Sequence, residues 1–419
     1  MLQRFDDFTT RSVRTDELAE FFGVMAMAFG EDRNDDDLPF ETLTAEPERS
    51  IAVFDGEQIV ATAGAFTFDM AVPGSPGSGG LVPTAGVTYV TVRATHRRRG
   101  LLSGMMRGQL LDIHDRGEPL AALWASESVI YGRFGYGLAS QLLRVELDRV
   151  DAKLRTDVPN DPDIDVQLVQ AGDAQSQIDQ VEQALVAGRP GTFVRDKRWI
   201  ESLVQDPPHR RHGLSSLQCV VASRGGEPVG YALYRTKPQS VRPYGLPDGE
   251  LAVVAQAALD PAANAAITRL LLSVDLMRRV RWWSLPVDTP LPHLLQDPRQ
   301  ARTTLVDQLH IRVVDVAAAL AARRYAGPTD VVIEVRDALC PWNDGRWRLT
   351  ADTDTASCER TTADADVTLP VETLGAVYLG GPALTALAAA GRAEGESGAL
   401  RRLSAALHSN AAPWCPVVF

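Results

Sequence analysis

The residues with the clearest chemistry in this chain form a short basic turn, Arg97-Arg98-Arg99-Gly100. A β-rich run at residues 87–92 precedes the turn, and apolar residues at helical spacing follow it from Leu101 to Ile113. The first N–H groups of a helix have no internal partners, the helix dipole favours negative charge, and a glycine lets a ligand approach the backbone closely. The turn therefore predicts an anion site of the kind that holds a pyrophosphate. It matches neither the nucleotide P-loop pattern nor the Rossmann pattern.

Two tyrosines in the run at residues 130–137 (IYGRFGYG) could supply a proton. A phenol whose pKa is about 10 stays protonated at neutral pH and can donate to a departing anion. The sequence alone does not distinguish Tyr131 from Tyr136 in this role. The segment at residues 414–419 (WCPVVF) is apolar and stiffened by proline, so we expect it to dock, with the terminal carboxylate of Phe419 ionised.

Length and charge limit the classes of protein that fit. A chain of 419 residues is too long for one ordinary hydrophobic core, so two or three domains are expected. The formal net charge of −12 disfavours nucleic acid as a partner and favours cationic substrates. The first residues contain no apolar leader segment and no run is long enough to span a bilayer, so we expect a cytoplasmic protein. The four cysteines lack zinc-site spacing, which favours thiols over disulfides and predicts no metal.

Patterns of strands and helices indicate an α/β protein with three parts, at residues 1–148, 149–300 and 301–419. In the first part, residues 51–66 predict a hairpin that turns at Asp55-Gly56, and residues 73–80 predict a surface loop.

The second part resembles a weakened copy of the first. It repeats the hairpin from Cys219 and the next strand at residues 251–260, and then predicts a helix at 262–279 and a strand at 280–285. The basic turn is missing here, which favours a duplicated fold without a second anion site. The third part predicts a helix at 313–325 and strands at 331–335 and 346–350.

The turn resembles a known signature. Arg97-x-x-Gly100-x-Leu102 is similar to the R/Q-x-x-G-x-G/A motif of GCN5-related N-acetyltransferases, with Leu102 in place of the last small residue. Longer runs in the same order resemble the Eis-type acetyltransferases of actinobacteria, and they extend over nearly the whole chain: LVPTAGVTYV (81–90), THRRRGLL (95–102), LWASES (123–128), IYGRFGYG (130–137), LPHLLQDPRQART (291–303), VVDVAAALAARRY (313–325) and VYLGG (377–381).

This resemblance implies a fold and an assembly. The fold would be α/β (α+β), with two tandem GCN5-related acetyltransferase-like domains followed by a sterol-carrier-protein-like α/β domain. The second acetyltransferase-like domain would be non-catalytic. The last domain would build the active site and the oligomer rather than carry lipid. The family also implies a homohexamer arranged as a trimer of dimers.

The resemblance assigns roles to individual residues. The co-substrate would be acetyl-CoA, with Tyr131 protonating the departing thiolate and the Phe419 carboxylate acting as general base. Glu31, which opens the acidic run at residues 31–37, and Tyr89 would face the substrate, although a solvated loop explains the acidic run equally well. The residues expected to hold acetyl-CoA are Val90, Val92, Arg97, Arg98, Gly100, Leu101 and Ser126.

The expected activity is acetyl transfer from acetyl-CoA to amines of polycationic substrates, with aminoglycosides acetylated at several positions. The amine would attack directly in a ternary complex, because no activated Ser or Cys nucleophile is evident. His96 and His114 are expected to be surface or capping residues rather than catalytic bases. Three alternatives remain: a lysine acetyltransferase acting on proteins or peptides, an acetyl-CoA-binding scaffold without catalysis, and a lipid-binding protein.

Overall fold

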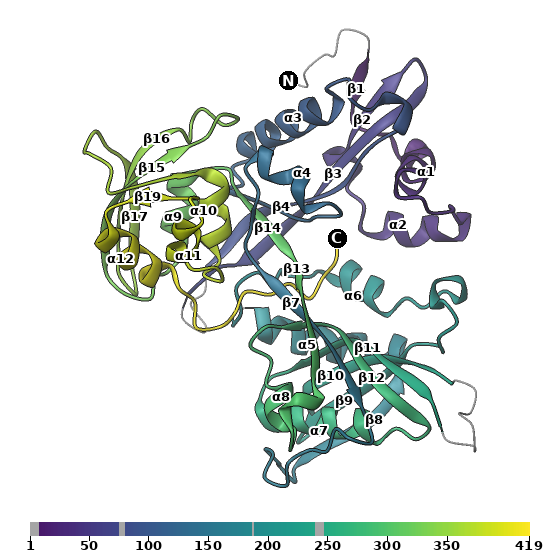
Figure 1. The fold of residues 1–419 in the computed structure, drawn as a ribbon. Helices are drawn as coiled ribbons and strands as arrows, with labels where there is room; N and C mark the ends of the chain where they lie inside the picture. The colour runs from purple at the N-terminus through teal and green to yellow at the C-terminus, as the bar shows by residue number, and fades with distance from the viewer. Residues whose placement is uncertain (1–7, 75–79, 187, 239–246) are drawn as a thin grey trace. The chain divides into compact units, whose positions relative to one another are not determined.

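A computed structural model of the chain describes residues 8–74, 80–186, 188–238 and 247–419. These residues form two compact units, each with its own sheet or sheets (Figure 1). Unit one contains the described residues up to Ser140, with Arg189–Val194 and Gln308–Phe419; unit two contains Gln141–Gly188 and Arg195–Asp307. Most of the surface loop predicted at residues 73–80 lies outside the described residues. The predicted domain boundaries at 148 and 300 stay predictions.

The first sheet of unit one carries the basic turn. Its order is β1-β2-β3-β4-β5-β14-β6, and β4 and β5 are parallel because α3 connects them. The predicted hairpin is confirmed as β2 and β3, with Gly56 in the left-handed conformation at the turn. The strands are β1 Thr9–Arg11, β2 Ile51–Asp55, β3 Gln58–Ala71, β4 Leu81–Val92, β5 Leu120–Trp124, β6 Gly137–Leu138 and β14 Leu309–Val313.

Helices pack on this sheet through apolar faces. Phe21 and Phe22 of α1 are buried against Ile59 of β3, and Met105 of α3 is buried in a cluster with Val53 and Val60. The helices are α1 Leu18–Phe29, α2 Leu38–Thr44, α3 Leu101–Asp115 and α4 Ser128–Tyr131, and the 3-10 turns are η1 Thr15–Glu17, η2 Asp35–Asp37, η3 Pro47–Arg49, η4 Ala94–His96 and η5 Gly132–Phe134.

Unit two repeats the strand order of the first sheet. The succession β9, β10, β11, α7, β12 matches β2, β3, β4, α3, β5, and β11 and β12 are again parallel. The sheet order is β13-β7-β12-β11-β10-β9-β8. The strands are β7 Gln141–Asp148, β8 Ile164–Gln170, β9 Gln218–Arg224, β10 Glu227–Lys237, β11 Gly249–Ala258, β12 Met277–Pro286 and β13 Arg302–Asp307.

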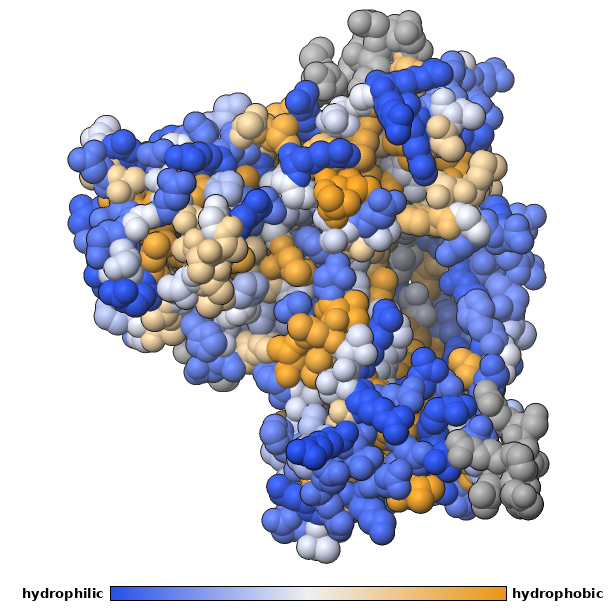
Figure 2. Space-filling view, viewed as in Figure 1, coloured by the Kyte–Doolittle hydropathy of each residue, from blue (hydrophilic) through white to orange (hydrophobic). Residues whose placement is uncertain are grey.

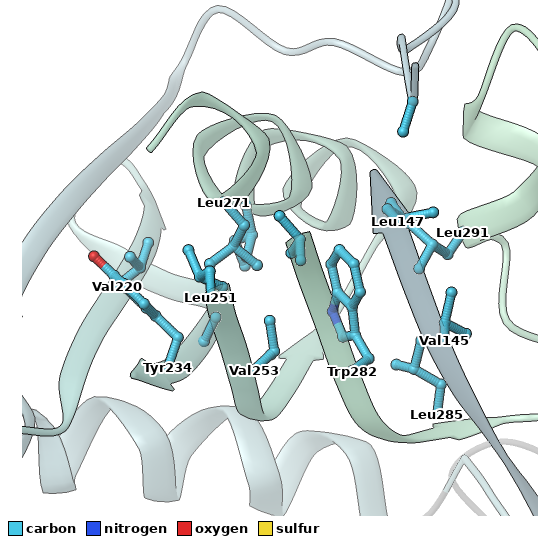
Figure 3. Close-up of a cluster of buried hydrophobic side chains, with 14 of the residues drawn as sticks. Val145, Leu147, Val220, Tyr234, Leu251, Val253, Leu271, Trp282, Leu285 and Leu291 are labelled. Carbon is cyan, nitrogen blue, oxygen red and sulfur yellow. The ribbon is translucent and has the colours of Figure 1, made fainter. Parts of the chain in front are cut away.

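One of the buried clusters of unit two lies between this sheet and α7, and another packs α5 and α6 against β9 and β10. Figure 3 shows Leu271 of α7 beside Leu251, Val253 and Trp282, all of them buried. The helix predicted at 262–279 is too long: α7 ends at Ser273, because Val274 adopts an extended backbone, and the chain then reaches β12 through Leu276, which has a left-handed φ of 66°. The helices are α5 Gln175–Val186, α6 Lys197–Val204, α7 Pro261–Ser273 and α8 Leu291–Leu294, with 3-10 turns η6 Ala171–Ala174, η7 Pro208–Arg211 and η9 Pro298–Gln300.

The C-terminal part of unit one contains a five-stranded sheet in the order β17-β16-β15-β18-β19. The helix predicted at 313–325 is also too long, because Val313 ends β14 and the Asp315 side chain caps α9 by accepting from the Ala318 N–H. The elements are α9 Val316–Ala322, β15 Thr329–Arg336, β16 Gly345–Ala351, β17 Ala356–Arg360, β18 Val367–Pro370, α10 Val371–Tyr378, α11 Leu384–Ala389, β19 Glu394–Gly395 and α12 Ser397–Leu407.

Residues after α12 return to the first sheet of unit one. Figure 1 shows this yellow segment leaving the C-terminal part and ending beside β4, and the Phe419 ring lies near Gly86 of that strand. Its predicted docking is confirmed, since Cys415 and Val417 are buried. In the described part of the chain, no helix is long and apolar enough to cross a membrane.

Candidate active site

A cavity of about 630 Å³ lies where α3 begins. The end of α1, the end of β4, the basic turn, the loop after β5 and α4 all contribute to it. In Figure 2 the surface over α4 is hydrophobic (orange) amid hydrophilic side chains (blue), in keeping with the 86% exposure of Val129. The lining residues are Ala28, Phe29, Val90, Thr91, Val92, His96, Arg97, Arg98, Gly100, Leu101, Leu102, Ser103, Ser126, Glu127, Ile130, Tyr131 and Arg133.

The basic turn has the backbone that an anion site needs. Arg98 and Gly100 both adopt left-handed conformations, with φ values of 63° and 82°, and α3 starts at Leu101. Gly100 has no side chain with which to cap the helix, so the first N–H groups of α3 are left for a ligand. Turns of this kind direct successive N–H groups into one concavity. The predicted anion-binding geometry is therefore present in the cavity wall.

Strand β4 bends immediately before the cavity. Tyr89 has a left-handed φ of 57°, and the pairing of β3 with β4 shifts register between Thr62 and Gly64. The Thr62 hydroxyl donates to the Tyr89 carbonyl at 2.7 Å and lies 2.6 Å from the Thr91 hydroxyl. A bulge of this kind turns the strand out of regular pairing. Val90 and Val92, which follow it, line the cavity.

The two candidate tyrosines differ in access to the cavity. Tyr131, at the end of α4, lines it, whereas Tyr136 does not. Burial raises the pKa of the Tyr131 phenol above its usual value, and the nearby Glu127 carboxylate raises that pKa further. Tyr136 is 1% exposed, and its hydroxyl has no hydrogen-bond partner among the described residues. Of the two, only Tyr131 is placed to meet a ligand there.

Some cavity residues were not singled out from the sequence. Arg133 adds a third cation to those of Arg97 and Arg98, and Phe29 adds an aromatic wall from α1. His96 also lines the cavity; its side chain is 12% exposed and bonds to Asp55 at 3.1 Å. These residues reach the cavity from separate elements. Only Arg133 had a local signal, its place within the IYGRFGYG run.

The lining of this cavity does not include three of the candidate residues, Glu31, Tyr89 and Phe419. Glu31 follows α1 and is exposed. Tyr89 packs edge-on against Phe21, Phe22 and Phe66, with ring centroids 5.4–5.8 Å apart.

Phe419 belongs to the same aromatic region as Tyr89. Its ring lies 5.3 Å from Phe68, 5.4 Å from Phe193 and 6.5 Å from Phe66. Phe66 therefore contacts both Tyr89 and Phe419 and links them. Burial raises the pKa of the Tyr89 phenol above its usual value, and the nearby carboxylates of Glu41 and Glu46 raise it further.

The repeated fold of unit two has a different helix start. At the position equivalent to Gly100, Asp260 caps α7 by accepting from the N–H groups of Ala262 and Ala263 at 3.0 and 2.9 Å. These are the donors that a phosphate would need, and the carboxylate would also repel one. The expectation that the anion site is not duplicated agrees with this cap.

The cysteines are buried thiols. Burial raises the pKa of Cys219 to about 12, of Cys340 to about 11 and of Cys358 to about 12. Because the thiolate is the nucleophile, these three side chains are poorly suited to carry an acyl group at neutral pH.

Comparisons with known proteins agree with this geometry. Models described as "Acetyltransferase (GNAT) domain" match residues 9–139 and 191–313, and a "Sterol carrier protein domain" matches residues 316–416. A protein of Streptomyces avermitilis described as an uncharacterized N-acetyltransferase is 47% identical over 97% of this chain and 98% of its own length. The N-acetyltransferase Eis of Mycobacterium tuberculosis is 36% identical over 85% of this chain and 84% of its own.

The chain belongs to the Eis-type N-acetyltransferases. The crystal structure of Eis1 from Mycobacterium abscessus has the same fold, with a TM-score of 0.81 and 29% identity over 98% of this chain and 100% of that one. The predicted order of two acetyltransferase domains and a sterol-carrier domain is confirmed. As an Eis-type enzyme, this protein is an acetyl-CoA-dependent N-acetyltransferase. The left-handed arginine turn, the uncapped start of α3 and the cavity beside them suit a phosphate-bearing co-substrate.

Proposed function

We propose that this enzyme acetylates amines of polycationic small molecules, with aminoglycosides modified at several positions as the expected substrates. The observation that carries the proposal is the convergence of a cationic turn, a helix N-terminus and one accessible phenol on a single cavity. The net charge of −12 supports a cationic acceptor, because it favours the approach of positive ligands. Glu41 and Glu46 beside Tyr89 add negative charge near the aromatic region.

We assign the binding of acetyl-CoA to the residues that line the cavity. Gly100 and Leu101 present helix N–H groups to the pyrophosphate, and Arg97 and Arg98 add charge. Val90 and Val92 offer main-chain groups to the pantetheine arm and thioester, and Ser126, which follows β5 and lines the same cavity, meets the pantetheine region.

The chemical step has a defined balance of bonds and protons. The amine nitrogen attacks the thioester carbonyl directly, a C–N bond forms, and the C–S bond breaks. Tyr131 gives its phenolic proton to the departing thiolate, and the Phe419 carboxylate accepts the proton lost from the amine. Because the raised pKa of Tyr131 keeps the phenol protonated, the donor is ready at neutral pH. Glu31 and Tyr89 would face the substrate.

The test is thiol release from acetyl-CoA with aminoglycosides, polyamines and lysine peptides as acceptors. Tyr131→Phe should lower kcat about 100-fold or more, the usual size of a lost general acid. Tyr136→Phe is the matched control, since it removes a buried hydroxyl outside the cavity and should leave kcat within about twofold. Release with lysine peptides alone would replace the proposed substrate class. Absence of release with every amine would contradict the proposal.

Two further expectations follow from family membership. We propose that the enzyme assembles as a homohexamer, a trimer of dimers, and that it works in the cytoplasm. Light scattering on the purified chain tests the first, and fractionation of the producing cell tests the second.

A further inference from the structure

The main-chain groups of the last residues of the chain are held by hydrogen bonds to other parts of unit one. The Trp414 N–H donates to the Pro190 carbonyl at 2.9 Å. The Cys415 N–H donates to Gln308 Oε1 at 3.0 Å, and Gln308 Nε2 donates back to the Cys415 carbonyl at 2.7 Å. Trp124 Nε1 donates to the Val417 carbonyl at 2.9 Å. Chain ends are usually frayed unless they are tied down, and these bonds tie this segment to the rest of unit one.

The Gln308 side chain bonds to both main-chain groups of one residue, Cys415, as a neighbouring β-strand would. Its amide is 1% exposed and satisfies both main-chain groups of Cys415. The Ser140 hydroxyl donates to the same Oε1 at 2.9 Å, and in turn accepts from the Leu309 N–H at 3.2 Å. These bonds fix the amide in one orientation. Ser140 and Gln308 are also the residues at which the chain leaves and re-enters unit one.

Trp124 connects the tail to the cavity. It is the last residue of β5, and Ser126 and Glu127, two and three residues further on, line the cavity. The bond from its indole to Val417 therefore fixes the tail to the same strand end that builds the cavity wall. Beyond Val417, the Phe419 ring packs against Phe68 and Phe193. The terminal carboxylate therefore belongs to a segment that is held by hydrogen bonds at Cys415 and Val417 and by the ring contacts of Phe419.

We propose that Gln308 and Trp124 are positioning residues that hold the Phe419 carboxylate in place for proton transfer from the amine. The inference rests on the proposed role of that carboxylate. A general base must lie within hydrogen-bond reach of the proton that it removes, and a displacement of about 1 Å can cost about 100-fold in rate. Neither side chain touches the reacting atoms in this scheme; each acts through the tail.

Trp124→Phe removes one indole donor and keeps an aromatic ring. The expected result is a fall in kcat of about 10-fold or more, with KM for acetyl-CoA unchanged. Trp347→Phe is the matched control, because Trp347 Nε1 also donates to a main-chain carbonyl, but that of Asn343, at 2.8 Å, within the part of the chain that carries the β15–β16 pair. The control should keep kcat within about twofold. Gln308→Met, which removes both bonds to Cys415, is the second variant and should act in the same direction.

The pH profile distinguishes positioning from general damage. When the base is displaced, the reaction depends on amine that is already deprotonated, so the deficit of Trp124→Phe should shrink as pH rises toward the amine pKa, near 10 for an alkyl amine. A deficit that is constant with pH would contradict a positioning role.

A double-mutant cycle separates this inference from the proposed function. Two glycines added beyond Phe419 move the carboxylate away and keep the ring. In that extended chain, Trp124→Phe should cause no further loss, because both changes remove the same contribution. An extended chain with full kcat would contradict the base role of the carboxylate itself. A large loss on extension, combined with an equal Trp124→Phe effect in both backgrounds, would leave the base role standing and overturn the positioning role.

Discussion

Arg312 of β14 binds both carboxylate oxygens of Asp337, each at 2.8 Å, in the interior of unit one. The two side chains are 0% and 2% exposed. Arg312 Nε also donates to the Phe134 carbonyl at 2.9 Å, in the turn that follows Tyr131. One buried ion pair therefore joins the first sheet, the C-terminal sterol-carrier domain and the turn that carries the proposed acid.

Removing one partner of this pair should destabilise unit one strongly. Asp337→Leu leaves a buried guanidinium without its counter-charge, which costs about 3–5 kcal/mol in comparable cases. The free energy of unfolding from urea titration measures the loss. The double variant Arg312→Met with Asp337→Leu should recover much of it, because no uncompensated charge remains. A single variant as stable as the parent chain would show that the pair does not hold the domains together.

The turn after Tyr131 depends on a glycine. Gly135 has a left-handed φ of 84°, and a Cβ at that position would lie 2.6 Å from Arg312 Nε and 2.8 Å from Val371 Cγ1. Gly135→Ala should therefore lower both stability and kcat, since Tyr131 lies in the same turn.

Gly117 supplies the control for that substitution. It has a similar φ of 73°, but a Cβ there would meet nothing within 4 Å. Gly117→Ala should cost only the backbone strain, about 1–2 kcal/mol, and should leave kcat unchanged. Thermal unfolding and kcat for both variants make the comparison. Equal effects on kcat would mean that the contact of Gly135 with Arg312 is unimportant.

A substitution can give the start of α3 an acidic residue, as the start of α7 in unit two has in Asp260. Gly100→Asp places a carboxylate at the start of α3, where it repels phosphate. The affinity for coenzyme A should fall about 10-fold or more, as measured by calorimetry.

Gly100→Asn separates charge from shape in the same position. Asparagine caps a helix and tolerates a left-handed backbone much as aspartate does, but it carries no charge. Its loss of affinity should be smaller than that of Gly100→Asp. In the unmodified chain, calorimetry should give one coenzyme A per chain. Two sites per chain, or equal affinities for the two variants, would contradict this account of the anion site.

The pH dependence of kcat should reflect the raised pKa of Tyr131. A general acid works in its protonated form, so its contribution is lost only as pH rises through its pKa. Because burial and Glu127 raise that pKa above its usual value of about 10, kcat should not fall on the alkaline side up to about pH 10. Steady-state rates at saturating substrates measure this. An alkaline fall centred near pH 8 would assign the acid to another group.

The sequence predicted those features that local patterns determine. Gly100 and its flanking arginines identified the anion turn, because a glycine at a helix start leaves a pattern that can be recognised without the fold. The apolar, proline-containing tail indicated docking. The two helices predicted at 262–279 and 313–325 are too long. Inside these apolar runs, an extended Val274 ends α7 and a capping Asp315 starts α9, and neither position is marked by the spacing of apolar residues.

The residues that contact the tail or reach the cavity from other elements could not be predicted from local patterns. Gln308 lies over a hundred residues before the tail that it binds, and nothing in its local sequence marks it. His96 and Phe29 reach the cavity only because β4 and α1 end beside α3. The choice of Tyr131 over Tyr136 also required the fold, because both lie in one short run and only the first lines the cavity.

The central claim concerns one carboxylate, and Cys415 allows that group alone to be changed. A synthetic Cys-Pro-Val-Val-Phe peptide can be ligated at Cys415 to a chain ending at Trp414, either as the free acid or as the C-terminal amide, which removes the charge and keeps every side chain. The acid should restore the activity of the unmodified enzyme. The amide should bind acetyl-CoA equally well and lose about 100-fold or more in kcat with an aminoglycoside. Equal kcat for acid and amide would contradict the account.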